Sequence, residues 1–353
     1  MKKELLQQNV YKRGLKGMIS DFFYDVKLML FPKLRQRSTQ SYKVERNIFI
    51  VAMLAIPLIQ WLIFWLYVVV QSMALAFKEV GRDTWGFLNF VSLWKYEVVY
   101  AFQGYTNANN IVDALENTFL FFGIHMLIQL PLSLIVAFFI YKKVLGYKVF
   151  RIVFYLPAVI PGIVMTQSFK ELVSERGILQ LITNGAIPVG GLLDPRLLEP
   201  TEAHRVVTGT IIFYYLWTSL TTSVLLFASG MARIPTEVLE AAKLDGVGPG
   251  REIVNLVIPL IWPTFTTQFI LAFTSLFSSG GPVLLLTKGN HDTVTLSYYI
   301  FYKMVGDGTN TANAGSEEAI AKVSAVGLVC TAVAVPICLF ARKLLNKVET
   351  IEY

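Results

Sequence analysis

Residues 234–259 read IPTEVLEAAKLDGVGPGREIVNLVIP. The first half of this segment is polar, and long apolar stretches at 206–229 and 256–279 flank it. Each flanking stretch is long enough to cross the hydrocarbon layer of a bilayer, about 30 Å thick, as a helix. The segment is therefore predicted to be a loop at a membrane surface, where it can contact a soluble partner.

The segment itself is predicted to form two short helices. Pro235 and Glu237 favour a helix start, because a proline in the first turn loses only an N–H that has no partner there, and a carboxylate suits the positive end of the helix dipole. Gly246 is predicted to end this helix with a bend. Gly248 permits a turn, and Pro249 begins a second helix that enters the next span. The two helices and the bend between them are expected to form a rigid lever that leads into the membrane.

The side chains of this lever are predicted to divide into two groups. Ala241 and Ala242 allow another backbone to approach one face closely. Glu237, Glu240 and Asp245 are expected to present carboxylates at the exposed end. Such a geometry suits a knob that seats in a groove of another protein.

The composition predicts an all-α integral membrane protein. Of the 353 residues, 54% are hydrophobic, 13% aromatic and only 16% charged, and the mean hydropathy is +0.55, outside the range of soluble domains. Only helices satisfy their own backbone in lipid, and interior prolines are tolerated there. Six spans are predicted, at 48–77, 117–141, 151–170, 206–229, 256–279 and 320–341.

The basic residues predict the orientation, since Lys and Arg near span ends favour the cytoplasmic side. With six spans, 21 of the 31 Lys and Arg fall in segments that lie on the same side of the membrane. These segments are the residues before the first span, the loop after the second, the loop between the fourth and fifth, and the tail. Both termini are therefore expected in the cytoplasm. The net charge of +7 reflects this topology and does not indicate binding of nucleic acid.

The predicted domains are a basic cytoplasmic segment at 1–47, a six-span domain at 48–345 and a cytoplasmic tail at 346–353. Residues 15–31 carry an apolar stripe of helical period, which predicts an amphipathic helix on the inner leaflet. The alternative is a helix packed on the protein's own inner surface, or a partly disordered segment. No cleavable signal is expected before the first span.

Several kinds of chemistry lack support in the sequence. Cys330 and Cys338 have no ligand spacing, and His125, His204 and His291 are scattered, so no metal site is predicted. No phosphate-binding G-x-x-x-x-G-K-[ST] motif occurs, so the chain is not expected to hydrolyse ATP or to act as an enzyme. Few ionisable residues fall within the spans, which argues against proton or sodium coupling.

A solute pathway is predicted from polar side chains in the fourth and fifth spans. A sugar requires hydroxyl or amide hydrogen bonds and an aromatic face, and these residues supply both. They are Trp217, Thr218, Ser219, Thr222, Gln268, Thr274, Ser275, Ser278 and Ser279. The alternative is that these Ser and Thr side chains only join helices within the membrane. Gln129 and His125 in the second span are weaker candidates.

Three outer segments, at 78–116, 171–205 and 280–319, are too long to be simple turns. They are predicted to form a docking surface on the extracytoplasmic side. The alternative is that they merely cap the bundle.

The run from Glu240-Ala241-Ala242 through Gly246 to Leu256-Val257-Ile258-Pro259 resembles the EAA signature of permease subunits of type I ABC importers. The family more often has isoleucine where this chain has Leu256, and leucine where it has Ile258. Both exchanges keep an aliphatic side chain of similar volume. Glu116-Asn117-Thr118, Phe154-Tyr155-Leu156-Pro157 and Gly280-Gly281-Pro282 add to the resemblance, which covers residues 48–345. The pattern is most similar to the carbohydrate branch, the maltose and glycerol-phosphate type permeases.

This resemblance implies a mechanism. The coupling helix of such permeases sits in a cleft of a cytoplasmic ATPase, and closure of the ATPase dimer on ATP turns the spans from inward-facing to outward-facing. Glu240, Ala241, Ala242 and Gly246 match the motif, while Glu237, Asp245 and Gly248 flank it. Glu240 is expected to be the polar contact with the ATPase. The alternative for Glu240 is a surface pair with Lys243, worth only about 0.2–0.5 kcal/mol.

The resemblance also implies partners: a second permease subunit in a heterodimer, two cytoplasmic ATPase subunits that bind ATP and Mg²⁺, and an extracytoplasmic solute-binding protein. The chain itself needs no cofactor, and its place is the bacterial cytoplasmic membrane. The expected function is import of a di- or oligosaccharide. Two alternatives remain open, an ATP-independent secondary transporter and a channel; the first would show inverted repeats and charges at the membrane midplane. Uptake that requires ATP would exclude both.

Overall fold

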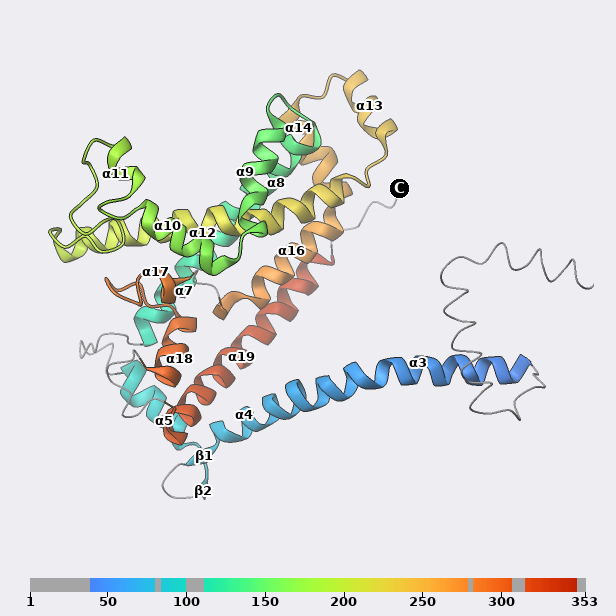
Figure 1. The fold of residues 1–353 in the computed structure, drawn as a ribbon. Helices are drawn as coiled ribbons and strands as arrows, with labels where there is room; N and C mark the ends of the chain where they lie inside the picture. The colour runs from blue at the N-terminus through green and yellow to red at the C-terminus, as the bar shows by residue number, and fades with distance from the viewer. Residues whose placement is uncertain (1–38, 80–83, 100–110, 279–281, 307–314, 348–353) are drawn as a thin grey trace, which may run out of the picture. The chain divides into compact units, whose positions relative to one another are not determined.

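The computed structural model describes residues 39–79, 84–99, 111–278, 282–306 and 315–347 (Figure 1). The apolar stripe at 15–31, Ser279 and the two glycines that follow it lie outside these ranges. The chain divides into two compact units, Met1–Gln71 and Ser72–Tyr353.

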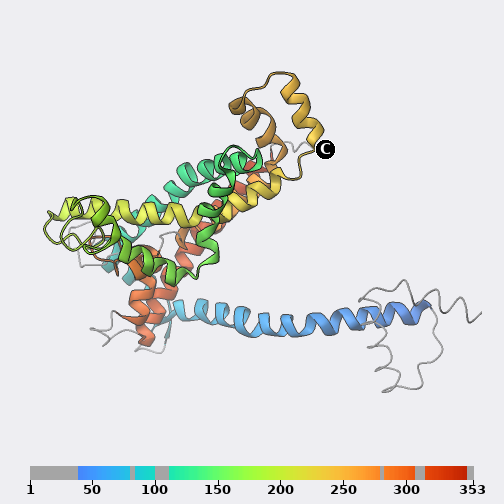
Figure 2. The same cartoon turned by 45° about the horizontal axis from the view of Figure 1, so that its top comes forward.

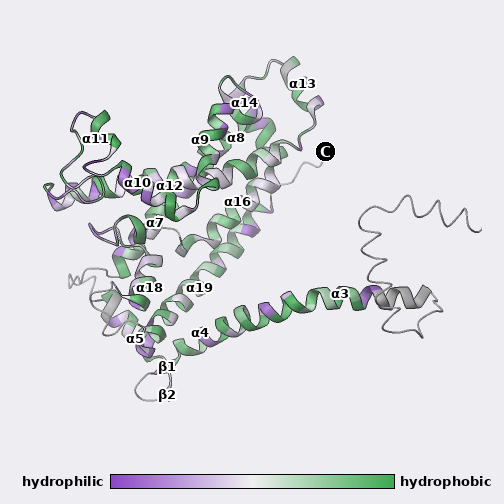
Figure 3. Cartoon of the chain, in the orientation of Figure 1, coloured by the Kyte–Doolittle hydropathy of each residue, from purple (hydrophilic) through white to green (hydrophobic). Residues whose placement is uncertain are grey.

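The first unit contributes one long apolar helix. It consists of α3 (Thr39–Trp61), a π-helical turn (Leu62–Tyr67) and the beginning of α4 (Val68–Ala76). The stretch Arg46–Ala76 has 31 residues and a mean hydropathy of 2.3, and at 1.5 Å per residue it is about 46 Å long. Figure 3 shows apolar residues along most of this stretch. The helix can therefore cross a membrane, as the sequence predicted.

The second unit contains three further helices of membrane-crossing length. The first runs over Ile111–Tyr141, the second is α12 (Pro200–Met231) and the third is α19 (Glu317–Leu345). Ile111–Tyr141 is continuous but has three parts, namely α7 (Ile111–Ile124), the π-helical turn η4 (His125–Gln129) and α8 (Leu130–Tyr141). With the helix of the first unit, four helices in the described ranges are long and apolar enough to span.

The third and fifth predicted spans are each bent near a proline. α9 (Tyr147–Val159) and α10 (Gly162–Leu172) meet at 114°. Ile160 between them is extended (φ −85°, ψ 134°), because Pro161 disfavours a helical conformation in the residue before it. Counting each bent pair as one span gives six among the described residues.

The bent fifth span begins with α14 (Pro249–Glu252) and continues through a π-helical turn (Ile253–Val257) and α15 (Ile258–Leu260). After a bend of 81° it goes on as α16 (Trp262–Thr274). Pro263 lies in the first turn of α16, where its missing N–H costs no helical bond. Residues on both sides of the bend are buried in the bundle, Val257 before it and Ala272 after it.

Short helices and two strands lie in the connections at the end of the second unit opposite to the loop after α8. They are β1 (Lys78–Glu79), β2 (Thr84–Trp85), α5 (Leu88–Ser92), η3 (Leu93–Val99), α11 (Ile178–Ile182), η6 (Leu276–Ser278), α17 (Val283–Leu286) and α18 (Leu296–Val305). The two strands pair antiparallel. The fold is thus mostly helical, as predicted, with one small hairpin that the all-α expectation lacked.

Contacts between distant segments define one end of the second unit. The side chain of Lys142, just after α8, forms an ion pair with Glu252 in α14. The indole Nε1 of Trp262 donates a hydrogen bond to the carbonyl of Leu345 at the end of α19, at 3.2 Å. Both views show these segments gathered beside α13 (Thr236–Leu244) (Figures 1 and 2). Three segments therefore lie at the same end of the second unit: the loop after α8, the α13 segment and the end of α19. The sequence predicted all three for the same side of the membrane.

The core at this end packs α8, α12 and α16 together. Its fully buried side chains include Phe227 and Met231 of α12 and Val257 just before α15. α12 and α16 approach closely at Gly230, where a Cβ would lie 2.8 Å from the Oγ1 of Thr264. A larger residue at Gly230 would therefore require the Thr264 side chain to shift.

Candidate functional site

α13 leaves the bundle through a short anchored turn. The N–H of Arg233 donates to the carbonyl of Gly230 at 3.2 Å, and the N–H of Ile234 donates to that of Met231 at 3.0 Å. The side chain of Ile234 is 4% exposed and packs in the core of α8, α12 and α16. The start of α13 is therefore fixed to the end of α12.

A left-handed glycine ends α13. Gly246 has φ +70°, a conformation that residues with a Cβ adopt at a cost. Beside it, the N–H of Val247 donates to the carbonyl of Ala242 at 3.1 Å, and the N–H of Asp245 donates to that of Ala241 at 3.0 Å. These bonds satisfy the last carbonyls of the helix. The bend predicted at Gly246 lies at this position.

The surface of α13 is both acidic and apolar. Glu237, Glu240 and Asp245 are exposed, as expected. Of the alanine pair, Ala241 is exposed and only Ala242 is buried. The side chain of Leu244 is 89% exposed, and the sequence analysis did not single it out. The side chain of Lys243 falls outside the described part of the chain, and so does the alternative pair with Glu240.

A buried ion pair holds the segment after α13. Glu252 in α14 has a side chain that is 8% exposed, and Lys142 one that is 20% exposed. The ammonium of Lys142 also lies 5.6 Å from the centre of the Phe138 ring in α8. Gly248, which precedes α14, is exposed and extended. The α13 segment is thus fixed at both ends, by Ile234 and by Glu252, while α13 itself projects.

A second polar group lies between three helices of the bundle. The Nε2 of Gln129 in η4 donates to the carbonyl of Ser219 at 3.1 Å and to the Oγ of Ser223 at 3.0 Å, both in α12. The Nε2 of Gln268 in α16 lies 3.4 Å from the carbonyl of Ser223. Gln129 is fully buried, and within the described ranges its Oε1 has no hydrogen-bond partner.

The other predicted pathway residues do not join this group. Trp217 packs against the core around Phe121 and Tyr214, and Thr222 is exposed. The hydroxyls of Thr218, Thr274, Ser275 and Ser278 donate to carbonyls three or four residues earlier. Helix α16 ends at Thr274, and Ser279 lies outside the described residues. Among the described pathway residues, only Ser219 and Gln268 belong to this group. Ser219 takes part through its backbone carbonyl, and Gln268 is joined to Gln129 through Ser223.

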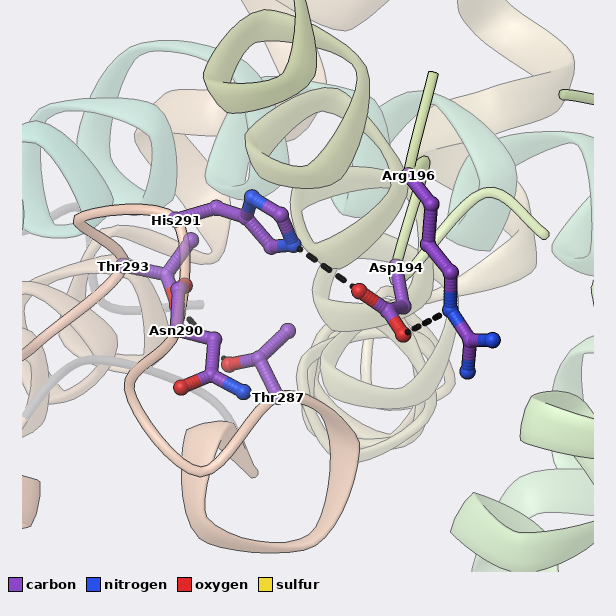
Figure 4. Close-up of polar contacts among 6 residues, drawn as sticks. All are labelled: Asp194, Arg196, Thr287, Asn290, His291 and Thr293. Atoms are coloured by element: carbon purple, nitrogen blue, oxygen red, sulfur yellow. Dashed lines mark hydrogen bonds and ion pairs between the residues drawn. The ribbon is translucent and has the colours of Figure 1, made fainter. Parts of the chain in front are cut away.

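Two connections at the end away from α13 are tied together by polar side chains (Figure 4). The carboxylate of Asp194 accepts a hydrogen bond from Arg196 Nε at 3.1 Å and lies 3.3 Å from His291 Nε2. The Nδ1 of His204 lies 2.8 Å from the carbonyl of His291. Burial opposes ionisation of Asp194, but the neighbouring Arg196 and His291 outweigh it and hold the pKa of this carboxyl below its ordinary value.

The loop that carries His291 is itself tightly folded. Lys288, His291 and Asp292 have positive φ values, and the hydroxyls of Thr287 and Thr293 are 2.8 Å apart (Figure 4). Within the described ranges, no three His, Cys, Asp or Glu side chains gather closely enough to hold a metal ion. The arrangement is a structural tie between two loops.

Comparison with known proteins places the chain. The family model of the binding-protein-dependent transport system inner membrane component matches residues 129–349. The chain belongs to this family. The matched region includes the Gln129 group, α13, the bent fifth span and α19, so the resemblance to ABC importer permeases is confirmed.

Relatives of this inner membrane component are named as permease proteins of sugar systems. The chain is 26% identical to the multiple sugar-binding transport system permease protein MsmF of Streptococcus mutans over 253 residues, covering 70% of this chain and 81% of MsmF. It is 28% identical to the lactose transport system permease protein LacF of Rhizobium radiobacter over 258 residues, covering 68% of this chain and 77% of LacF.

Solved structures show the same fold. A bacterial ABC transporter that imports the acidic polysaccharide alginate has a chain with a TM-score of 0.67 and 20% identity, covering 89% of this chain and all of that one. The same transporter in complex with a periplasmic protein bound to an alginate pentasaccharide gives a TM-score of 0.67 at 19% identity, with coverage of 88% and 98%. At this identity the likeness concerns the fold alone.

Proposed function

We propose that this chain is a permease subunit of an ATP-driven, binding-protein-dependent importer of a carbohydrate, a di- or oligosaccharide. The family match and the sugar systems named for MsmF and LacF support this proposal. The partners are a second permease in a heterodimer, two ATPase subunits that bind ATP and Mg²⁺, and a solute-binding protein. The end with α13 then faces the cytoplasm, together with both termini.

The observation that carries the proposal is an exposed helix on a fixed base. α13 projects from the bundle, yet Ile234 and the Lys142–Glu252 pair attach its flanking turns to α8 and α12. A force applied to α13 by a closing ATPase would therefore move these helices instead of deforming a loop. Glu240 is the proposed polar contact, and Leu244, whose side chain is 89% exposed, is proposed to bury apolar surface against the partner.

The remaining coupling residues have supporting roles in this proposal. Glu237 and Asp245 give α13 a negative surface, while Ala241 leaves room for a partner's backbone to approach. Ala242 packs against the chain itself, and Gly246 with Gly248 sets the return of the chain toward the bundle.

The proposed solute contacts centre on the polar group between η4, α12 and α16. Gln129, Ser219 and Gln268 lie there, and the unpaired Oε1 of Gln129 can accept a hydrogen bond from a sugar hydroxyl when the helices separate. Trp217 is the proposed aromatic face for the sugar ring; its ring packs against the core around Phe121 and Tyr214, so it would meet the sugar from a different face of α12 than Ser219. The remaining predicted pathway residues are proposed as secondary contacts.

The test is ATP-dependent uptake by the assembled transporter in vesicles. Glu240→Lys and Leu244→Ser are expected to lower uptake about tenfold or more, because loss of a central interface contact costs about 2 kcal/mol or more. Matched controls are Lys347→Glu, a charge reversal at an exposed residue just after α19, and Leu145→Ser, a leucine that is 97% exposed in the loop after α8. Both controls should transport normally.

Two outcomes would contradict the proposal. One is normal uptake by both α13 variants. The other is uptake that continues without ATP or without the ATPase subunits, which would indicate a secondary transporter or a channel.

A further inference from the structure

We infer that a phospholipid with a negatively charged head group binds in a groove between α8 and α9. The groove has a volume of about 380 Å³, which is within the range of small-molecule sites. Its walls are entirely aliphatic and aromatic, with Ile135, Val136 and Phe139 from α8 and Tyr147, Phe150 and Phe154 from α9. An acyl chain matches these walls.

The groove opens outward from the helix pair. Ile135 is 40% exposed, Phe139 47% and Phe150 53%. Their exposed faces surround the groove instead of belonging to the core that α8 shares with α12. In a bilayer such a surface meets lipid tails, and an acyl chain that enters it gains dispersion contacts on several sides at once.

The length of the groove favours an acyl chain over a protein helix. From Tyr147 to Phe154 the axis of α9 rises about 10 Å, at 1.5 Å per residue. This is less than half of the roughly 30 Å hydrocarbon layer. The groove therefore ends within one leaflet, whereas a helix of a partner subunit that crosses the membrane would need a longer one.

Three basic residues are sequence neighbours of the groove lining. Lys143, Lys148 and Arg151 are exposed, and each adjoins a residue of the groove lining, namely Val144, Tyr147 or Phe150. No ion pair in the described ranges engages these three residues, while Lys142 next to them is paired with Glu252. The guanidinium of Arg151 lies 5.7 Å from the centre of the Tyr155 ring, which orients it without neutralising it.

The sequence around the groove carries no compensating acid. Between Glu116 and Glu171 there is no Asp or Glu, and Glu252, which reaches this end from α14, is already paired with Lys142. A phosphate accepts charge-assisted hydrogen bonds from both Lys and Arg. Since each basic residue near an anionic lipid contributes roughly fivefold to binding, the charge selects anionic over zwitterionic head groups.

The experiment uses the assembled transporter. It rests on the proposed function only in assuming that this chain assembles with a second permease and with ATPase subunits. The complex is placed in vesicles of equal amounts of phosphatidylglycerol and phosphatidylcholine, extracted, and its retained lipids are identified by native mass spectrometry. The wild type is expected to retain phosphatidylglycerol selectively. The triple variant Lys143→Gln, Lys148→Gln, Arg151→Gln should lose this preference, with affinity falling on the order of a hundredfold.

Two further variants make the result decisive. The control Arg342→Gln, Lys343→Gln, Lys347→Gln removes three exposed charges at the same end, on and just after α19, and should keep the preference. Ile135→Trp fills the groove but leaves the charges, and it should displace the lipid. Co-isolation of the ATPase subunits is recorded for each variant, so that failure of assembly is distinguished from loss of lipid.

Equal retention of phosphatidylglycerol by the wild type and the triple variant would overturn the inference. Efficient crosslinking of Phe150→Cys to the partner permease would also overturn it, since protein would then occupy the groove.

Discussion

At the scale of single residues, the ion pair of Lys142 and Glu252 is the most sensitive point near α13. Both side chains are largely buried, and removing one member of such a pair leaves an uncompensated charge that costs about 3 kcal/mol or more. Lys142→Met is therefore expected to lower the thermal unfolding temperature of the solubilised protein. The double variant Lys142→Met, Glu252→Met should recover much of the loss, because apolar side chains can replace a buried pair.

Scanning fluorimetry of the three variants, including Glu252→Met alone, would check this expectation. A double variant less stable than either single variant would show that the pair is not the source of the effect.

Individual residues differ in how far the sequence could predict them. The bend at Gly246 was predictable, because only glycine adopts its positive φ without strain. The partner of Glu252 was not, since Lys142 lies 110 positions earlier and no helical spacing relates the two. The partners of Gln129 were not predictable for the same reason, because Ser219 and Ser223 lie on another helix.

At the scale of elements, Asn117 on α7 positions the loop before α18. Its Nδ2 donates to the carbonyls of Asp292 and Val294, both at 2.8 Å, and Asn117 is 8% exposed. The neighbouring Thr118 Oγ1 accepts a hydrogen bond from the N–H of Leu296 at 2.9 Å. Asn117→Ala leaves two partly buried carbonyls without this donor, which costs about 1–3 kcal/mol.

The expected result for Asn117→Ala is faster amide hydrogen exchange in residues 287–295, with little change around α13. Thr210→Ala serves as the control, because the Thr210 hydroxyl bonds only to the carbonyl of Val206 in its own helix. Unchanged exchange in the loop would show that other contacts, such as the Asp194–His291 tie, suffice to hold it.

The spans show why element boundaries were predicted better than their bends. Pro157 and Pro336 lie inside α9 and α19, whereas Pro161 coincides with a break. All three are prolines in apolar surroundings, and they differ in whether the preceding residue is helical or extended. That choice depends on packing between helices, so the sequence revealed the prolines but not the bend angles.

At the scale of the whole molecule, the distribution of charge predicted which connections share a side. The contacts of Lys142 with Glu252 and of Trp262 with Leu345 join three of the segments expected together. The tie between Asp194 and His291 joins two of those expected on the other side. The side of the membrane that each end faces stays a prediction from the basic residues near span ends. The polar group around Gln129 required knowledge of which helices are neighbours.

The central claim is that α13 carries the motion of an ATPase into the bundle. The most direct measurement is crosslinking from Asp245→Cys, in a chain whose Cys330 and Cys338 are replaced by alanine, within the assembled transporter. The account predicts a crosslink to the nucleotide-binding subunit that blocks ATP-dependent uptake, and reaction with a membrane-impermeant thiol reagent only in inside-out vesicles. Labelling of this cysteine from outside intact cells, with no crosslink to any nucleotide-binding protein, would contradict it.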